Sequence, residues 1–185
     1  MLDNEITSEG GIECVSRLAC AEDLPVLAIF ERELARISFP EDPILDLEYH
    51  TEKLQRAMER EPEGMIVQTV SAPDAPAGDE IASWLWLSTR TTLATSESYG
   101  LLRSLYVRPR YRRHGLALSL ADYAMRYFSA REVKKIMAKV HATNKPAIQV
   151  LRQVGFEPLH TTLQLRLEPG LPFLFDDEEE QMDDD

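Results

Sequence analysis

Apolar residues recur at two different periods along this chain, and each period predicts a type of secondary structure. The first helical face consists of four apolar residues three or four positions apart, Leu27, Phe30, Leu34 and Ile37. Asp23 as N-cap and Pro25 in the first turn predict the start of this helix. The stretch 39–43, with two prolines, ends it, and a second, weaker helical pattern covers 44–60.

Strand patterns surround these helices. The β-prone segments bounded by turn residues are 12–18, 64–70, 80–89, 135–141, 156–159 and 161–167. In the third of them, Trp84 and Trp86 fall on one face and Leu85 and Leu87 on the other, because side chains alternate along a strand. A last helix is expected between Asn144, which suits an N-cap, and Gly155, which suits a helix end.

The stretch 102–117 combines a strand, a basic turn and the start of a helix. Pro109 cannot donate to a sheet ladder, so the strand should end near Val107. A helix should start near Gly115, because apolar residues follow at helical spacing: Leu116, Leu120, Ala121, Ala124, Tyr127 and Phe128. The turn then presents unpaired N–H groups and a helix dipole, which attract phosphate. Arg112 and Arg113 add charges that suit phosphate geometry.

Two other interpretations of this basic turn stay open. Its four arginines, Arg108, Arg110, Arg112 and Arg113, are compatible with a nucleic-acid patch or with a solvated turn. The net charge of −12 speaks against nucleic acid. Eight of the 32 acidic residues lie in the last ten positions, which predicts a disordered, solvated tail.

The elements follow one another as β-α-α-β-β-β-α-β-α-β-β, which predicts a single mixed α/β domain. Two motifs in it carry a family resemblance. Arg112-Arg113-His114-Gly115-Leu116-Ala117 resembles R/Q-x-x-G-x-G/A, the acyl-CoA pyrophosphate loop of the GNAT superfamily of acyl-CoA-dependent N-acyltransferases. Asn144-Lys145-Pro146-Ala147-Ile148, followed by Gly155-Phe156, resembles that family's later N-x-x-A-(I/V) helix. The resemblance covers 12–168 and leaves 1–11 as a disordered N-terminus and 169–185 as the acidic tail.

The resemblance implies a fold, a reaction and a binding site. The fold is a central mixed, mostly antiparallel sheet flanked by helices. The reaction moves an acetyl group from acetyl-CoA, the co-substrate, to a primary amine of a small molecule or protein, without a metal. The residues implied in acetyl-CoA binding are Leu105, Tyr106 and Val107 along the pantetheine, and Arg112, Arg113, His114, Gly115, Leu116, Ala117, Leu118 and Asn144. The alternative is a non-catalytic acyl-CoA-binding module with the same fold.

The family's usual acid and base are missing here. The common Tyr seven residues after Asn144 is Leu151, on an apolar helix face, and the Glu found in some members is Lys139. His141 is the first candidate for moving the proton, because histidine changes charge near neutral pH. An ordinary hydrogen-bonded histidine is the competing interpretation. Tyr106 and Tyr99 are candidate acids, and Glu97 is a candidate base acting through water.

The partners are only partly readable. We expect a small-molecule or peptide amine as acceptor, no nucleic acid, no membrane, and a homodimer as a possible assembly. Acidic residues between the first two helices, Glu41, Asp42, Asp46 and Glu48, would suit a cationic amine, and Trp84 and Trp86 could wall its cleft. Cys14 and Cys20 are interpreted as reduced core residues of a cytoplasmic protein, not as a disulfide or metal site.

Overall fold

The computed structural model describes residues 5–9, 12–71, 79–91 and 97–163. Its strands are β1 (Glu5–Glu9), β2 (Ile12–Leu18), β3 (Met65–Ser71), β4 (Asp79–Thr91), β5 (Ser98–Val107) and β6 (Ile136–Ala138). Its α-helices are α1 (Leu24–Ser38), α2 (Leu47–Arg60), α3 (Leu116–Ser129) and α4 (Lys145–Gln153).

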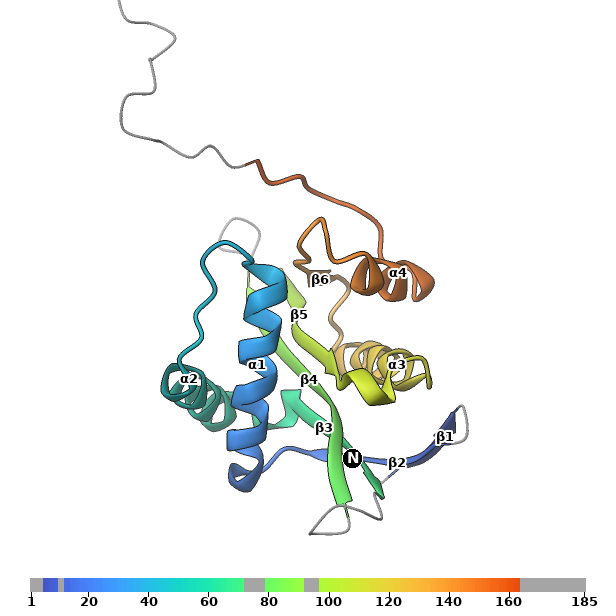
Figure 1. Ribbon diagram of the computed structural model, residues 1–185. Helices are drawn as coiled ribbons and strands as arrows, with labels where there is room; N and C mark the ends of the chain where they lie inside the picture. Colours follow the sequence, from blue (N-terminus) through green and yellow to red (C-terminus); the bar gives the residue numbers. More distant parts are fainter. Residues whose placement is uncertain (1–4, 10–11, 72–78, 92–96, 164–185) are drawn as a thin grey trace, which may run out of the picture.

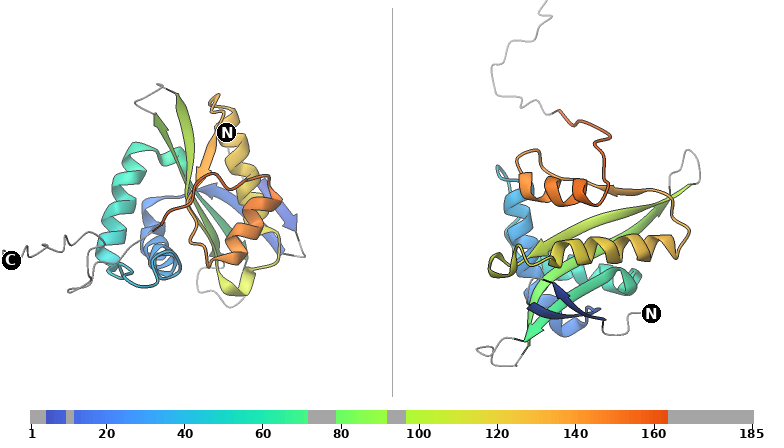
Figure 2. Two further views of the ribbon diagram at one scale, coloured as in Figure 1. Left: turned by 90° about the horizontal axis from the view of Figure 1, so that it is seen from above. Right: turned by 90° about the vertical axis from the view of Figure 1, so that its right-hand side faces the viewer.

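All six strands form one sheet in the order β1-β2-β3-β4-β5-β6. Neighbours pair antiparallel except β5 and β6, which are parallel. Helices α1 and α2 cover one face of the sheet, and α3 and α4 lie on the other (Figures 1 and 2). The predicted mixed α/β fold with a mostly antiparallel central sheet is confirmed.

Strand β4 divides the core between the two helical layers. Trp84 and Trp86 pack with α1 and α2, whereas Leu85 and Leu87 pack with α3. This is the predicted alternation, and it holds because a strand presents successive side chains to opposite faces.

A β-bulge interrupts the pairing of β4 with β5. Ser104 lies opposite Trp86 and Leu102 lies opposite Leu87, so that Arg103 is an extra residue without a direct partner. Such a bulge bends the strand and re-aims a side chain. Here it turns Arg103 toward the face of α1 and α2, where its guanidinium lies over the ring of Trp86.

A polar row crosses the sheet beneath the first turns of α3. The fully buried Gln68 of β3 accepts a hydrogen bond from Ser83 Oγ of β4 at 2.6 Å. Its Nε2 donates to Ser16 Oγ of β2 at 3.3 Å and to Ser119 Oγ of α3 at 3.1 Å. The Gln68 amide thus ties α3 to three strands through both its oxygen and its nitrogen.

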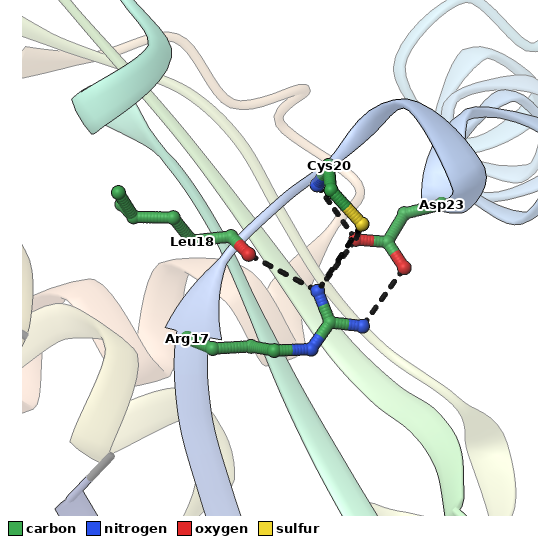
Figure 3. A network of polar contacts seen from close by, with 4 residues as sticks. All are labelled: Arg17, Leu18, Cys20 and Asp23. Atoms are coloured by element: carbon green, nitrogen blue, oxygen red, sulfur yellow. Dashed lines mark hydrogen bonds and ion pairs between the residues drawn. The ribbon is translucent and has the colours of Figure 1, made fainter. Parts of the chain in front are cut away.

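The turn from β2 into α1 is held by an ion pair (Figure 3). Arg17 donates to both carboxylate oxygens of Asp23, at 2.6 and 2.8 Å, and the Cys20 N–H donates to Asp23 at 2.9 Å. Asp23 therefore precedes α1 as predicted, but its side chain makes no capping bond to that helix. Burial would raise the Asp23 pKa, yet the bonds from Arg17 and Cys20 outweigh it and lower that pKa.

Several predicted boundaries are wrong. The sequence predicts no structure over 1–11, but Glu5–Glu9 forms β1, paired with β2. The second helix begins at Leu47 rather than at position 44, because Asp46 caps it by accepting the Glu48 N–H. The strand expected over 135–141 is confined to Ile136–Ala138.

No strand forms over 156–163, where the sequence predicts two, and the rest of the second one lies outside the described residues, as does the acidic tail. Cys20 is exposed rather than part of the core, whereas Cys14 is buried. None of the described helices is long and apolar enough to cross a membrane.

Candidate functional site

The turn between β5 and α3 has a backbone that departs from the usual helical and extended regions. A short 3-10 turn, Pro109–Tyr111, follows β5, and the chain then takes positive φ at Arg113 (68°) and at Gly115 (80°). Glycine adopts this region without the penalty that a Cβ imposes. Gly115 is the N-cap of α3, as its predicted place at the start of that helix requires.

The four arginines of this turn divide into two pairs. Arg108 and Arg110 both form ion pairs with Glu80 of β4, and Tyr111 donates to the same carboxylate at 2.8 Å. Arg112 instead donates from Nε to the carbonyl of Val107 at 3.1 Å. Neither Arg112 nor Arg113 has a carboxylate partner within the described ranges, and both are exposed, so these two remain available to an anion.

The start of α3 is fixed in place from below. Leu116 is 2% exposed and packs in a cluster with Cys14, Val70, Ala82 and Val107. The N–H groups of Leu118 and Ser119 donate to the Gly115 carbonyl, whereas those of Leu116 and Ala117 have no acceptor inside the helix. The helix dipole adds partial positive charge at the same point. The loop therefore offers free N–H groups and positive charge at one point, and the phosphate site expected here stays a prediction.

Strand β5 has an open edge next to this loop. Its pairing with β6 stops at Leu102 opposite Ala138, although β5 continues to Val107. The Arg108 N–H donates to Ala82 of β4, and antiparallel pairs alternate, so Tyr106 directs its main chain to β4. Leu105 and Val107 direct theirs to the open edge. Of the three residues predicted to hold pantetheine, these two direct main-chain groups there, although the Val107 carbonyl already accepts from Arg112.

The candidate proton carriers differ in what already occupies them. The Thr143 N–H, which can only donate, lies 3.3 Å from His141 Nδ1, and Thr143 Oγ lies 2.7 Å from the same atom. The Nδ1 lone pair of His141 is therefore used within its own turn. The Tyr106 side chain is stacked on Phe30 at 4.6 Å between ring centroids. Its hydroxyl has no hydrogen-bond partner in the part of the chain that the structure describes.

The other residues named from the sequence are placed as follows. Asn144 accepts the Ala147 N–H at 3.3 Å and caps α4, as predicted. Leu151 is half-buried, and none of the residues of α4 is fully buried. Lys139 is exposed and lies beyond the end of β6. Tyr99 lies near the start of β5, about 20 Å along the strand from Leu105, and Glu97 precedes it, so neither reaches the open edge.

The face of α1 and α2 holds a charged cluster that the sequence did not reveal. Glu31 of α1 is 4% exposed and accepts from Trp84 Nε1 and from Lys53 Nζ, both at 3.0 Å. Lys53 and Arg103 both lie over the Trp86 ring, at 5.1 and 4.8 Å from its centroid. Partial burial, followed by repulsion from Arg90, lowers the pKa of Arg103. The buried indole N–H of Trp84 was the one sequence signal that required such an acceptor.

Comparisons with known proteins identify the family and the fold of the chain. The chain matches the sequence profile described as the acetyltransferase (GNAT) family over residues 29–156. No curated protein matches it significantly.

Three solved structures share the fold at low sequence identity. A possible acetyltransferase from Clostridium difficile 630 aligns with a TM-score of 0.65 and 18% identity, over 84% of this chain and 98% of that chain. A protein described as a predicted acetyltransferase, with acetyl-CoA, from Clostridium acetobutylicum aligns with a TM-score of 0.62 and 17% identity, over 83% of this chain and 96% of that chain. A chain of the NatC complex bound to Gag peptide and CoA aligns with a TM-score of 0.62 and 15% identity, over 80% of this chain and 86% of that chain.

Proposed function

Because this chain belongs to the GNAT family of acetyltransferases, we propose that it transfers an acetyl group from acetyl-CoA to a primary amine of a small molecule or protein. One observation carries the proposal. The N-terminus of α3, with Gly115 at positive φ and with Arg112 and Arg113 free of carboxylates in the described ranges, lies directly beyond the open edge of β5. An anion site and a row of main-chain groups are thus in line, as a diphosphate followed by an amide-containing arm requires. Two structural neighbours, solved with acetyl-CoA or with CoA, support the choice of ligand.

In this proposal the diphosphate binds the α3 N-terminus, and Leu105 and Val107 bind the pantetheine amides. A main-chain N–H at the open edge polarises the thioester carbonyl, as an oxyanion hole does. The amine nitrogen attacks that carbonyl carbon, the C–S bond breaks, the amine loses a proton and the departing thiolate gains one. Positioning the two reactants supplies a large part of the rate.

We assign protonation of the departing thiolate to Tyr106 as first candidate and to His141 as second. The Tyr106 hydroxyl has no partner among the described residues, whereas His141 Nδ1 is already an acceptor within its own turn. Tyr106→Phe keeps the stacking on Phe30 and removes only the hydroxyl, and we expect kcat to fall about a hundredfold or more. In His141→Gln, kcat should fall by less than about twofold. The opposite ranking of the two variants would return the role to His141.

Isothermal titration with acetyl-CoA tests the assigned loop. Gly115→Asp puts a carboxylate and a strained φ where the phosphates would bind, and we expect it to abolish measurable affinity. Gly155→Asp is the matched control, since Gly155 also has positive φ (96°) and a Cβ at that position would meet no atom within 4 Å. Equal affinity in the wild type and Gly115→Asp would contradict the assignment.

The alternative is an acyl-CoA-binding module without catalysis, and the replacement of the usual tyrosine by Leu151 favours it. A thiol-release assay across amines, polyamines, aminoglycosides and peptide N-termini separates the two. Binding of acetyl-CoA without turnover of any of these acceptors would favour the module.

A further inference from the structure

We propose that Arg103 binds a carboxylate of the acceptor, so that the acceptor is a molecule carrying both a primary amine and a nearby carboxylate. The inference rests on the proposed acetyl transfer and specifies its substrate class. A free amino acid and a peptide with an acidic first residue share this chemistry, and the experiment below separates them.

The first step is the position of Arg103. Arg103 is the extra residue of the bulge, so it has no direct partner on β4, whereas Leu102 and Ser104 on either side of it do. It directly follows Leu102, where β5 and β6 part, and it precedes Leu105 by two residues, or about 7 Å of strand. Arg103 is therefore adjacent to the place where the thioester would lie.

The second step is the side from which an acceptor approaches. The phosphate loop leads into α3, and α3 and α4 lie on that face of the sheet (Figure 1). An acceptor that meets the thioester from the other face passes the side of α1 and α2. Arg103 is turned to that side and is exposed.

The third step is that Arg103 lacks a counterion. Three other arginines beside the sheet are each paired with a carboxylate: Arg17 with Asp23, Arg90 with Glu61, and Arg108 with Glu80. Across the described residues, Arg103 has neither a hydrogen bond nor an ion pair, and its only close contact of this kind is the Trp86 ring.

The fourth step is the local charge. Glu31, the buried carboxylate of this cluster, is already bonded to Trp84 and Lys53, and Glu61 is bonded to the Thr89 N–H as well as paired with Arg90. Both carboxylates that act on Arg103 are thus already bonded to other groups, whereas its cationic neighbours Arg90 and Arg60 only add positive charge, in a protein whose net charge is −12. A guanidinium offers a planar fork of N–H donors, which a carboxylate matches with two hydrogen bonds.

The test compares matched acceptors with matched variants. The acceptors are alanine against alaninamide, and the carboxamide peptides Asp-Ala-Ala against Asn-Ala-Ala. The proteins are the wild type, Arg103→Gln, Arg103→Lys and the control Arg126→Gln. The control makes the same charge change on α3, where Arg126 pairs with Asp122.

We expect the wild type to prefer the carboxylate member of one pair by about tenfold or more in kcat/KM, as a charge-assisted bond implies. Alanine would identify a free amino acid, and Asp-Ala-Ala a peptide. Arg103→Gln should lose the preference, chiefly through KM, while keeping its affinity for acetyl-CoA. Arg103→Lys should keep part of it, and Arg126→Gln all of it.

Other outcomes separate the two proposals. Acetyl transfer without a carboxylate preference, or a preference that survives in Arg103→Gln, overturns the acceptor assignment and leaves acetyl transfer standing. Failure to bind acetyl-CoA overturns the proposed function itself. If acetyl-CoA binds but no acceptor turns over, the binding of the acceptors is measured instead. The CoA-loaded protein is titrated with the same four acceptors while its tryptophan fluorescence is monitored. A carboxylate-dependent change that Arg103→Gln abolishes supports the assignment, and no such change overturns it.

Discussion

Replacing the buried amide of Gln68 should show how much the polar row that joins α3 to the sheet contributes to stability. Gln68→Leu keeps nearly the same volume but removes the acceptor of Ser83 and the donor to Ser16 and Ser119. Ser83 is 0% exposed and Ser16 is 7% exposed, so water cannot easily replace the lost bonds there.

The magnitude follows from these exposures. A buried polar group left without a partner costs about 1–3 kcal/mol. The fully buried Ser83 hydroxyl accounts for one such cost, while the less buried Ser119 hydroxyl can turn to water. We therefore expect Gln68→Leu to lower the free energy of unfolding by about 2–3 kcal/mol.

A second substitution tests the reason and not only the size. Removing both partners of a buried hydrogen bond is much less costly than removing one. The double variant Gln68→Leu/Ser83→Ala should therefore be more stable than Gln68→Leu alone, by about 1 kcal/mol or more. Urea unfolding followed by circular dichroism measures all three proteins. A double variant less stable than Gln68→Leu would refute the reasoning, because the loss would then come from packing.

Two further substitutions test packing and charge. Gly100→Ala puts a Cβ 2.7 Å from the fully buried ring of Phe128, so thermal unfolding should show a loss of about 1–3 kcal/mol that Phe128→Leu partly restores; an unchanged midpoint would contradict this contact. Asp23→Asn should destabilise the protein near neutral pH, and the difference from the wild type should shrink as the pH falls. The reason is that Arg17 and Cys20 hold the Asp23 pKa below its unfolded value, so the carboxylate contributes fully above the unfolded pKa and loses its contribution as the pH falls through the folded pKa. A difference in unfolding free energy that stays constant from pH 7 to pH 3 would exclude this explanation.

Sequence patterns correctly predicted the features of this protein that depend on residues close together in the sequence. The alternation of Trp84, Leu85 and Trp86 follows from the geometry of a single strand, and the cap by Asn144 from a single helix end. The turn at Gly115 is likewise local. Such features are fixed within one element, and the periodicity of the chain records them.

The features that were missed depend on contacts between distant segments. Nothing near Arg110 in the sequence shows that Glu80 neutralises it, and nothing near Arg103 shows a bulge, because the register of β4 against β5 is a property of the pair. Strand β1 is short and polar, so it becomes a strand only by pairing with β2. The strands expected after Gly155 had the right composition, but a strand also needs a neighbour, and none pairs with 156–163 in the described structure.

The parting of β5 from β6 has a consequence for hydrogen exchange. Amides usually exchange slowly at the centre of a sheet and quickly at its edges. Here the Leu105 and Val107 amides belong to the strand that joins both helical layers, yet they point to an edge that β6 does not cover. We expect them to exchange with solvent deuterium faster than the flanking Tyr106 amide, with the contrast disappearing when acetyl-CoA is bound. If acetyl-CoA binds at this edge as proposed, it takes the place of a missing strand, and slow exchange at the centre of the sheet would then depend on the co-substrate.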